Sequence, residues 1–68
     1  MAKIGIAIDT WKLSIFERHL RQADYYFEQF PGVAPDTLLL TVVTENAVGL
    51  YGVVQNANRE AAQTKASQ

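Results

Sequence analysis

The stretch TLLLTVVT, residues 37–44, decides the fold, because it is the strongest β-strand signal in the chain. Leucine and valine fill it, and Thr41 is the one polar residue in its interior. A run that is apolar on both faces is typical of a central strand with cover on both sides. We therefore predict that residues 37–44 form the middle strand of a sheet.

The residues before this run predict a neighbouring strand. Tyr25 to Phe30 is short and rich in aromatic residues, which favours a strand. Pro31-Gly32 is expected to end this strand, and Pro35-Asp36 is typical of a turn that leads into the next strand. The connection is about five or six residues long, and this spacing predicts a hairpin.

The residues after the central strand predict a helix over 47–61, followed by a frayed polar tail over 63–68. Gly49 and Gly52 fall inside this helix, where each costs about 1 kcal/mol relative to alanine. With Asn56 they make a small-residue face that permits close approach by another element. Alternatively, the helix tolerates them or packs tightly on its own sheet. The predicted apolar stripe comprises Ala47, Leu50, Tyr51, Val54, Ala57 and Ala61.

The N-terminal segment from Lys3 to Ile8 alternates with a period of two, which predicts a half-buried strand. Residues 14–17, S-I-F-E, have the pattern of a capping box. In this motif Ser14 is the N-cap, and the side chain of Glu17 accepts a hydrogen bond from the backbone N–H of Ser14. Glu17 and Arg21 are one turn apart and are expected to pair. We predict an amphipathic helix from Ser14 to near Asp24, with Phe16, Leu20 and Ala23 on its apolar face.

The predicted order is β-α-β-β-α, within one α+β domain over residues 1–62. A right-handed crossover from the first to the second strand leaves room for the third between them, with both helices on one face. The resulting sheet order, 1-3-2, resembles a ferredoxin-like sandwich without its last strand. ACT domains and many small ligand-sensing modules are similar to this architecture.

The opening KIGIAIDTWKLSIFERHL resembles the start of small uncharacterised proteins encoded in phage and prophage genomes. The resemblance covers about the first third of the chain and includes no catalytic motif. It implies a host-interaction or accessory role rather than a role in metabolism.

The composition narrows the functional classes. A chain of 68 residues buries only about 60% of its unfolded surface, so small domains usually need reinforcement. The sequence has no cysteine and one histidine, which excludes disulfides and argues against zinc; we expect no cofactor. Self-association is the remaining reinforcement. A net charge of −1 gives no electrostatic case for nucleic acid or a membrane surface, and we expect a cytoplasmic protein.

Several residues around the first strand-to-helix turn are candidates for function. Asp9 is either a ligand or base, or it shapes the turn with Thr10 through side chain to backbone bonds, which we favour. Leu13 is expected to fill the apolar space at the end of the sheet, which the chain crosses between the first strand and the helix. Trp11 is therefore free to anchor a partner or a neighbouring subunit together with Lys12, although a core position is the alternative.

The chain lacks a nucleophile with a base and an orienting group, so no enzyme is expected. We expect His19 to have a packing role, and the aromatic residues of 25–30 to pack rather than to bind single-stranded nucleic acid. The helix-free face of the sheet is predicted to carry Ala7, Leu39, Val43 and some of those aromatic residues, which is too apolar to remain in water.

The first strand is also an open edge. We therefore predict a non-enzymatic interaction module that forms a homodimer through the open face, the open edge, or both. The alternative is an ACT-like module that binds a small metabolite at the subunit interface.

Overall fold

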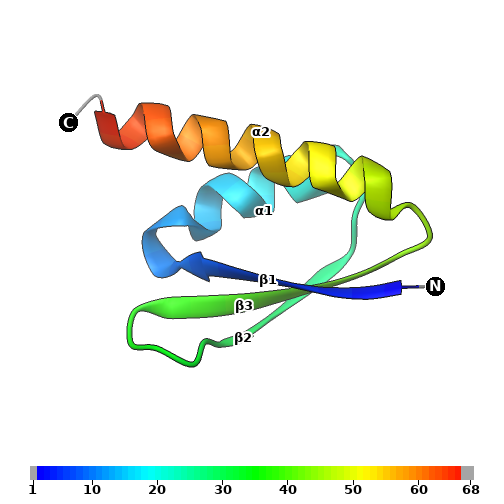
Figure 1. The fold of residues 1–68 in the computed structure, drawn as a ribbon, viewed down its shortest axis with the longest axis horizontal. Helices are drawn as coiled ribbons and strands as arrows, with labels where there is room; N and C mark the ends of the chain where they lie inside the picture. The colour runs from blue at the N-terminus through cyan, green and yellow to red at the C-terminus, as the bar shows by residue number, and fades with distance from the viewer. Residues whose placement is uncertain (1, 67–68) are drawn as a thin grey trace.

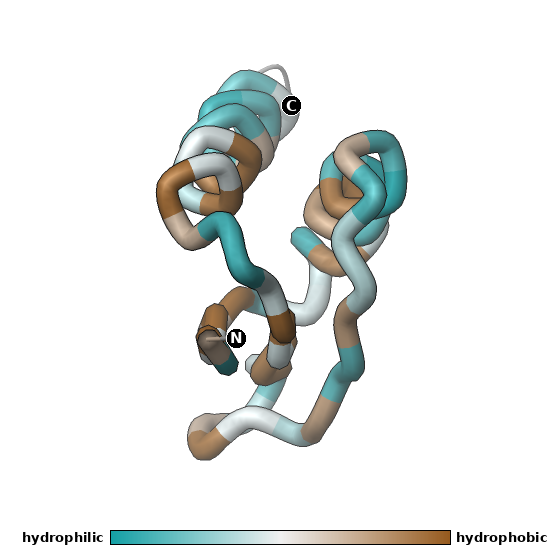
Figure 2. The backbone as a smooth tube through the Cα atoms, turned by 90° about the vertical axis from the view of Figure 1, so that its right-hand side faces the viewer, coloured by the Kyte–Doolittle hydropathy of each residue, from teal (hydrophilic) through white to brown (hydrophobic). Residues whose placement is uncertain are grey.

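The computed structural model describes residues 2–66, and it confirms the predicted α+β class and element order. In these residues a three-stranded antiparallel sheet has the order β1-β3-β2, so the predicted central strand is confirmed. Figures 1 and 2 show both helices on the same face of this sheet. The elements are β1 (Ala2–Asp9), the 3₁₀ helix η1 (Thr10–Lys12), α1 (Leu13–Gln22), β2 (Phe27–Pro31), β3 (Thr37–Thr44) and α2 (Ala47–Ala66).

The hydrophobic core lies between the helix layer and the sheet. On β3, Leu40 and Val42 alternate on the side that faces the helices, and both are fully buried. Each large aliphatic or aromatic side chain buried in this way contributes about 1.5–3 kcal/mol of transfer free energy. The buried hydrophobic residues are Ile8, Ile15, Phe16, Leu20, Leu40, Val42, Leu50, Ala57 and Ala61.

The cover predicted for both faces of β3 is present on one face only within the protomer. Leu39 and Val43 point to the other side and are 38% and 40% exposed. The reason is topological, since both helices pack on the same face (Figure 2). Within residues 2–66 the opposite face carries no helix, as the element order predicts.

The capping box predicted at Ser14 is wrong. α1 begins at Leu13, and its N-cap residue, Lys12, makes no side-chain capping hydrogen bond. η1 runs directly into α1, so the backbone N–H of Leu13 already donates to the carbonyl of Thr10. Ser14 consequently lies inside the first turn. The predicted ion pair does form, with 2.7 Å between Arg21 Nη2 and Glu17 Oε1.

α1 ends in a Schellman motif, and this shifts the start of the second strand. Asp24 adopts a left-handed backbone with φ of 63°. The N–H of Tyr25 donates to the carbonyl of Leu20 at 2.9 Å, and that of Asp24 donates to Arg21 at 3.1 Å. Tyr25 therefore belongs to the helix terminus, and the strand predicted over residues 25–30 is β2, Phe27–Pro31.

The predicted hairpin between β2 and β3 is confirmed. Gly32 donates its N–H to the carbonyl of Thr37 at 3.0 Å, which closes the loop at its base. The hydroxyl of Thr37 donates to the carbonyl of Ala34 at 2.5 Å. The backbone N–H of Thr10 donates to the carbonyl of Asp36 at 2.9 Å. This last bond ties the end of the hairpin loop, next to β3, to η1.

α2 is capped by a residue that the sequence analysis did not single out. Asn46 Oδ1 accepts a hydrogen bond from the N–H of Gly49 at 2.9 Å, as an N-cap does for the third residue of a helix. The helix continues to Ala66, so residues 63–66 of the predicted frayed tail are helical, and residues 67–68 lie outside the described part. Tyr51 is not part of the packed stripe; it is 59% exposed, and Val53 packs against the core instead.

These two helix starts predict losses of different size for two substitutions at the helix ends. Asn46→Ala should lower the free energy of unfolding by about 1 kcal/mol, because it removes the acceptor of an orphan backbone donor. Ser14→Ala should change it by less than about 0.5 kcal/mol, since alanine is the better helix former inside a helix. Urea unfolding followed by circular dichroism measures both. Equal losses for the two variants would contradict this account of the caps.

Candidate functional site

The face of the sheet that points away from the helices, called the open face below, is the first candidate surface. Its side chains alternate along each strand with those of the core. The strand register aligns them in rows: Ala7, Leu39 and Phe30 form one row across the three strands, and Gly5, Thr41 and Glu28 form the next. Lys3 and Val43 pair in the third row, which Tyr26 extends just before β2.

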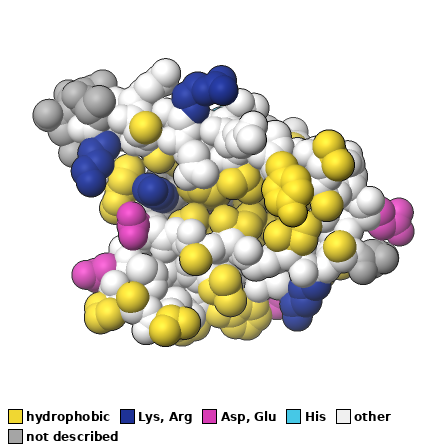
Figure 3. All heavy atoms as spheres, in the orientation of Figure 1, with side chains coloured by type: hydrophobic (Ala, Val, Ile, Leu, Met, Phe, Trp, Pro, Cys, Tyr) yellow, Lys and Arg dark blue, Asp and Glu magenta, His cyan; other side chains and the backbone are white. Residues whose placement is uncertain are grey.

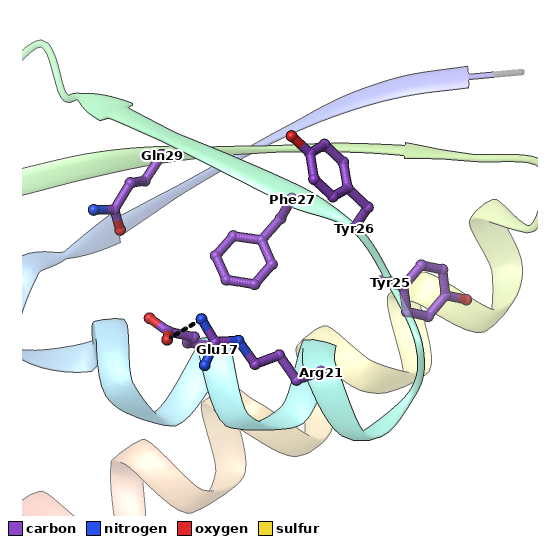
Figure 4. A pocket seen from close by; sticks show the side chains of 6 residues that line it. All are labelled: Glu17, Arg21, Tyr25, Tyr26, Phe27 and Gln29. Carbon is purple, nitrogen blue, oxygen red and sulfur yellow. Dashed lines mark ion pairs between the residues drawn. The ribbon is translucent and has the colours of Figure 1, made fainter.

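The open face is strongly apolar. Phe30 is 44% exposed and Tyr26 is 71% exposed, beside the half-exposed Leu39 and Val43. In Figure 4 the ring of Tyr26 lies on the opposite side of β2 from the ring of Phe27, which points toward α1. In Figure 3 the sheet is seen edge-on, and separate groups of hydrophobic side chains lie along its lower rim. The predicted open-face positions Ala7, Leu39 and Val43 thus share this face with two aromatic rings, and the row of Gly5, Thr41 and Glu28 lies between the two groups of apolar side chains.

A hollow of about 260 Å³ lies at the hairpin end of the open face. Ala7 and Leu39 line it from the sheet, and Pro31 to Ala34 line it from the hairpin. The side chain of Leu39 leans over β1, because a Cβ added to Gly5 would lie 3.3 Å from Leu39 Cδ1. The lining is almost entirely apolar, so this hollow suits a hydrophobic side chain or an apolar small molecule.

A second, wider hollow of about 470 Å³ lies between α1 and β2 (Figure 4). Phe27 points into it, and the ion-paired Glu17 and Arg21 line its α1 side. The two opposite charges satisfy each other, so this hollow offers no uncompensated charge to a ligand. Within residues 2–66, no group of three or more histidine, aspartate or glutamate side chains is placed to hold a metal ion.

The outer edge of β1 is open in the described part of the chain, since β1 pairs with β3 alone. Ile4 and Ile6 on this strand are only partly buried, although they face the helix layer. Figure 3 shows an apolar band between the helix layer and the sheet. The open edge predicted for the first strand is therefore present in the protomer.

Asp9, Trp11 and Lys12 come together at the end of β1, as their positions in the sequence predict. Lys12 Nζ lies 3.8 Å from Asp9 Oδ2 and 5.4 Å from the centre of the Trp11 ring, and Lys65 Nζ of α2 lies 6.0 Å from the same ring. Trp11 is 44% exposed, so its indole is not a buried core group. A partner for this surface stays a prediction.

The role predicted for the side chain of Asp9 is wrong in one respect. Asp9 precedes η1 but makes no side-chain capping hydrogen bond with it. The turn is instead organised by the backbone bond from Thr10 to Asp36 and by the ion pair between Asp9 and Lys12. Leu13 packs against the core, as expected of an apolar plug.

The two glycines of α2 have different surroundings. A Cβ on Gly49 would lie 2.8 Å from Tyr25 Oη and 2.5 Å from Asn46 Nδ2, so its close approach is made by the chain itself. Tyr25 Oη also donates to the carbonyl of Asn46 at 3.3 Å. A Cβ on Gly52 would meet no atom within 4 Å. Within the protomer, the close approach predicted for these glycines is therefore made at Gly49, by Tyr25 and Asn46, and an approach by another element at Gly52 stays a prediction.

His19 links the two helices. Its Nε2 lies 3.1 Å from Oε1 of Glu60 on α2, and Arg18 pairs with the second oxygen of the same carboxylate. The packing role predicted for His19 agrees with this position. Sequence reasoning missed Glu60, because only the crossing of α1 and α2 brings residues so distant in the chain together.

No protein-family model matches the chain, and neither a curated protein nor a solved structure shows significant similarity to it. These comparisons identify no phage relative. In the described residues, no helix combines the length and the hydropathy needed to cross a membrane. The functional proposal below therefore depends on the surfaces of the molecule.

Proposed function

We propose that this chain is a non-enzymatic protein-interaction module that works as a homodimer assembled through the open face. The observation that carries the proposal is the exposure of four large apolar side chains on the side without helices: Leu39, Val43, Phe30 and Tyr26. Monomeric proteins rarely leave such a surface in water. A second copy covers it with a surface of the same composition.

The size of the open face sets the strength expected of the dimer. Strands of eight residues extend over about 26 Å, and three strands span about 14 Å across the sheet. Two such faces in contact therefore cover at most on the order of 700 Å² in projection, since β2 has only five residues. This area is below the roughly 1,200 Å² of standard specific interfaces and is typical of a weak dimer. We expect a dissociation constant in the micromolar range.

The charges on the open face permit self-association. Of the residues that define this face, Lys3 and Glu28 carry opposite charges, and both are exposed. Neither takes part in an ion pair within residues 2–66. The charges of these two residues cancel on each face. Each copy therefore brings one unpaired cation, Lys3, and one unpaired anion, Glu28, to the contact.

The dimer leaves two surfaces for a protein partner. The first is the Trp11 and Lys12 corner, where a half-exposed aromatic ring lies beside two cations. The second is the edge of β1, whose free backbone groups accept an added strand. An accessory or host-interaction role, which the resemblance of the N-terminal third to phage proteins implies, requires such surfaces.

An ACT-like ligand-binding module is the second candidate function. The observation that favours it is the apolar hollow of about 260 Å³ lined by Ala7, Leu39 and the hairpin, which a face-to-face dimer would enclose. A thermal-shift screen of small apolar metabolites separates the two functions. The second candidate is supported by a ligand that raises the melting temperature of the unmodified protein but not that of the Ala7→Phe variant.

Two valine-to-glutamate variants test the lead proposal. Val43→Glu places a carboxylate on the open face and should give the mass of a monomer at concentrations where the unmodified protein is a dimer. Val48→Glu is the matched control, because Val48 is 81% exposed on α2, away from the sheet, and should leave the dimer intact. Light scattering after gel filtration measures both masses. A dimer that tolerates Val43→Glu contradicts assembly through the open face.

A further inference from the structure

We infer that the two copies stack with their two-fold axis parallel to the strands, so that Phe30 of each copy enters the hollow above Ala7 of the other. This inference rests on the proposed homodimer and specifies how its faces meet. It follows from the strand register, the side-chain sizes in each row and the positions of the two free charges.

The symmetry allows two aligned arrangements. Sheets that pack face to face keep their strand directions within about 30° of each other. The two-fold axis of such a pair therefore runs either nearly parallel or nearly perpendicular to the strands. A parallel axis lays β1 over β2 of the second copy and keeps every row at its own level. A perpendicular axis places each strand over the same strand of the second copy, for example β1 over β1, and reverses the order of the rows.

The sizes of the side chains favour the parallel axis. β1 presents the small Gly5 and Ala7 on the open face, while β2 presents Glu28 and Phe30 at the same levels. A parallel axis therefore sets Ala7 against Phe30 and Gly5 against Glu28. The hollow of about 260 Å³ beside Ala7 and Leu39 lies where the Phe30 ring of the second copy arrives.

A perpendicular axis through the middle row pairs these residues poorly. It sets Phe30 against Tyr26 of the second copy, so that large side chains meet on β2. On β1 it sets Ala7 against Lys3, which leaves the apolar hollow without an apolar occupant. The atoms that line an unfilled apolar void lose van der Waals contacts. The parallel axis leaves no such void.

The charges favour the same arrangement. A parallel axis sets Lys3 over Tyr26 of the second copy, one row from Glu28 of that copy, and one row is about 6.8 Å along a strand. A lysine side chain reaches across that step. A perpendicular axis through the middle row sets Glu28 against Glu28 of the second copy, where like charges repel. Within one protomer, Lys3 and Glu28 lie on opposite outer strands of the sheet.

This arrangement has a functional consequence. The hollow that an ACT-like module would use for its ligand is filled by a phenyl ring in the dimer. Ligand binding at that position and dimer formation then compete. This arrangement therefore leaves no metabolite site at that position of the subunit interface.

A truncation of Phe30 tests the aromatic contact. Because each dimer contains two such contacts, Phe30→Ala should weaken dimerisation at least about 30-fold. Tyr51→Ala is the matched control, since Tyr51 is an exposed aromatic residue on α2, and it should change the dimerisation constant less than about twofold. Sedimentation equilibrium measures both constants. Equal effects of the two variants would overturn the inference.

A charge-reversal cycle tests the axis. Lys3→Glu and Glu28→Lys should each weaken the dimer about fivefold or more, and the double variant should restore it to within about twofold of the unmodified protein. Effects that add in the double variant overturn the parallel axis, and a dimer that nevertheless forms leaves the proposed function standing. If the unmodified protein does not dimerise at all, the proposed function itself fails.

Discussion

Leu40→Ala is expected to remove a large part of the free energy of unfolding, whereas the same change at the neighbouring Leu39 should leave the stability of the protomer nearly unchanged. Leu40 is completely buried beneath the helices, and Leu39 lies on the open face. Truncation of a buried leucine to alanine costs about 2–5 kcal/mol, from lost transfer free energy and the cavity left behind. A domain of this size has a stability near the lower end of the usual range of about 5–15 kcal/mol.

The free energy of unfolding of the two leucine variants is measured by urea unfolding at a fixed protomer concentration, followed by circular dichroism. Dimerisation contributes to the apparent stability, so the concentration has to be the same for all samples. Leu39→Ala should show its main effect in the dimerisation constant, which sedimentation measures on the same samples. Similar losses of protomer stability for the two leucines would show that the assigned faces of β3 are wrong.

Gly32→Ala is expected to have the second largest effect, because it obstructs the base of the hairpin. A Cβ at Gly32 would lie 2.7 Å from the carbonyl carbon and 2.8 Å from the Cβ of Thr37. The obstruction involves backbone, which cannot rotate away as a side-chain end does. The hairpin has to open and strain the bond from the Gly32 N–H to the Thr37 carbonyl. Such overpacking costs about 1–3 kcal/mol.

Gly52→Ala is the matched control and should have the opposite sign. No atom lies within 4 Å of the added Cβ, and the residue is exposed inside α2. Alanine in an exposed helix interior is about 0.5–1 kcal/mol more stable than glycine. Thermal unfolding should therefore show a lower midpoint for Gly32→Ala and a higher one for Gly52→Ala. Two shifts of the same sign would contradict the surroundings described for these glycines.

The fold follows from local patterns where those patterns are strong. The apolar run at residues 37–44 and the Pro-Gly and Pro-Asp pairs before it place β3 and the hairpin. The predictions that failed depend on tertiary contacts. Ser14 has the pattern of an N-cap, but η1 precedes it and is held by a bond from Thr10 to Asp36, which a local pattern does not contain. Tyr51 matches a helical stripe, yet it is exposed in the folded chain and Val53 packs against the core in its place.

The candidate surface was predictable to the extent that it depends on alternation. A period of two is enough to place Ala7, Leu39 and Val43 on the side opposite the core. Alternation does not show which residues of different strands share a row, because that depends on the register of the pairs. The alignment of Ala7 with Phe30, and the hollow beside them, therefore became visible only in the folded sheet.

Sedimentation equilibrium of the unmodified protein over a wide concentration range tests the central claim most directly. The protomer has a mass of 7.6 kDa. A reversible dimer held by the open face predicts an average mass that rises from this value toward twice this value as the concentration passes through the micromolar range. An average mass of 7.6 kDa at every concentration would contradict the claim.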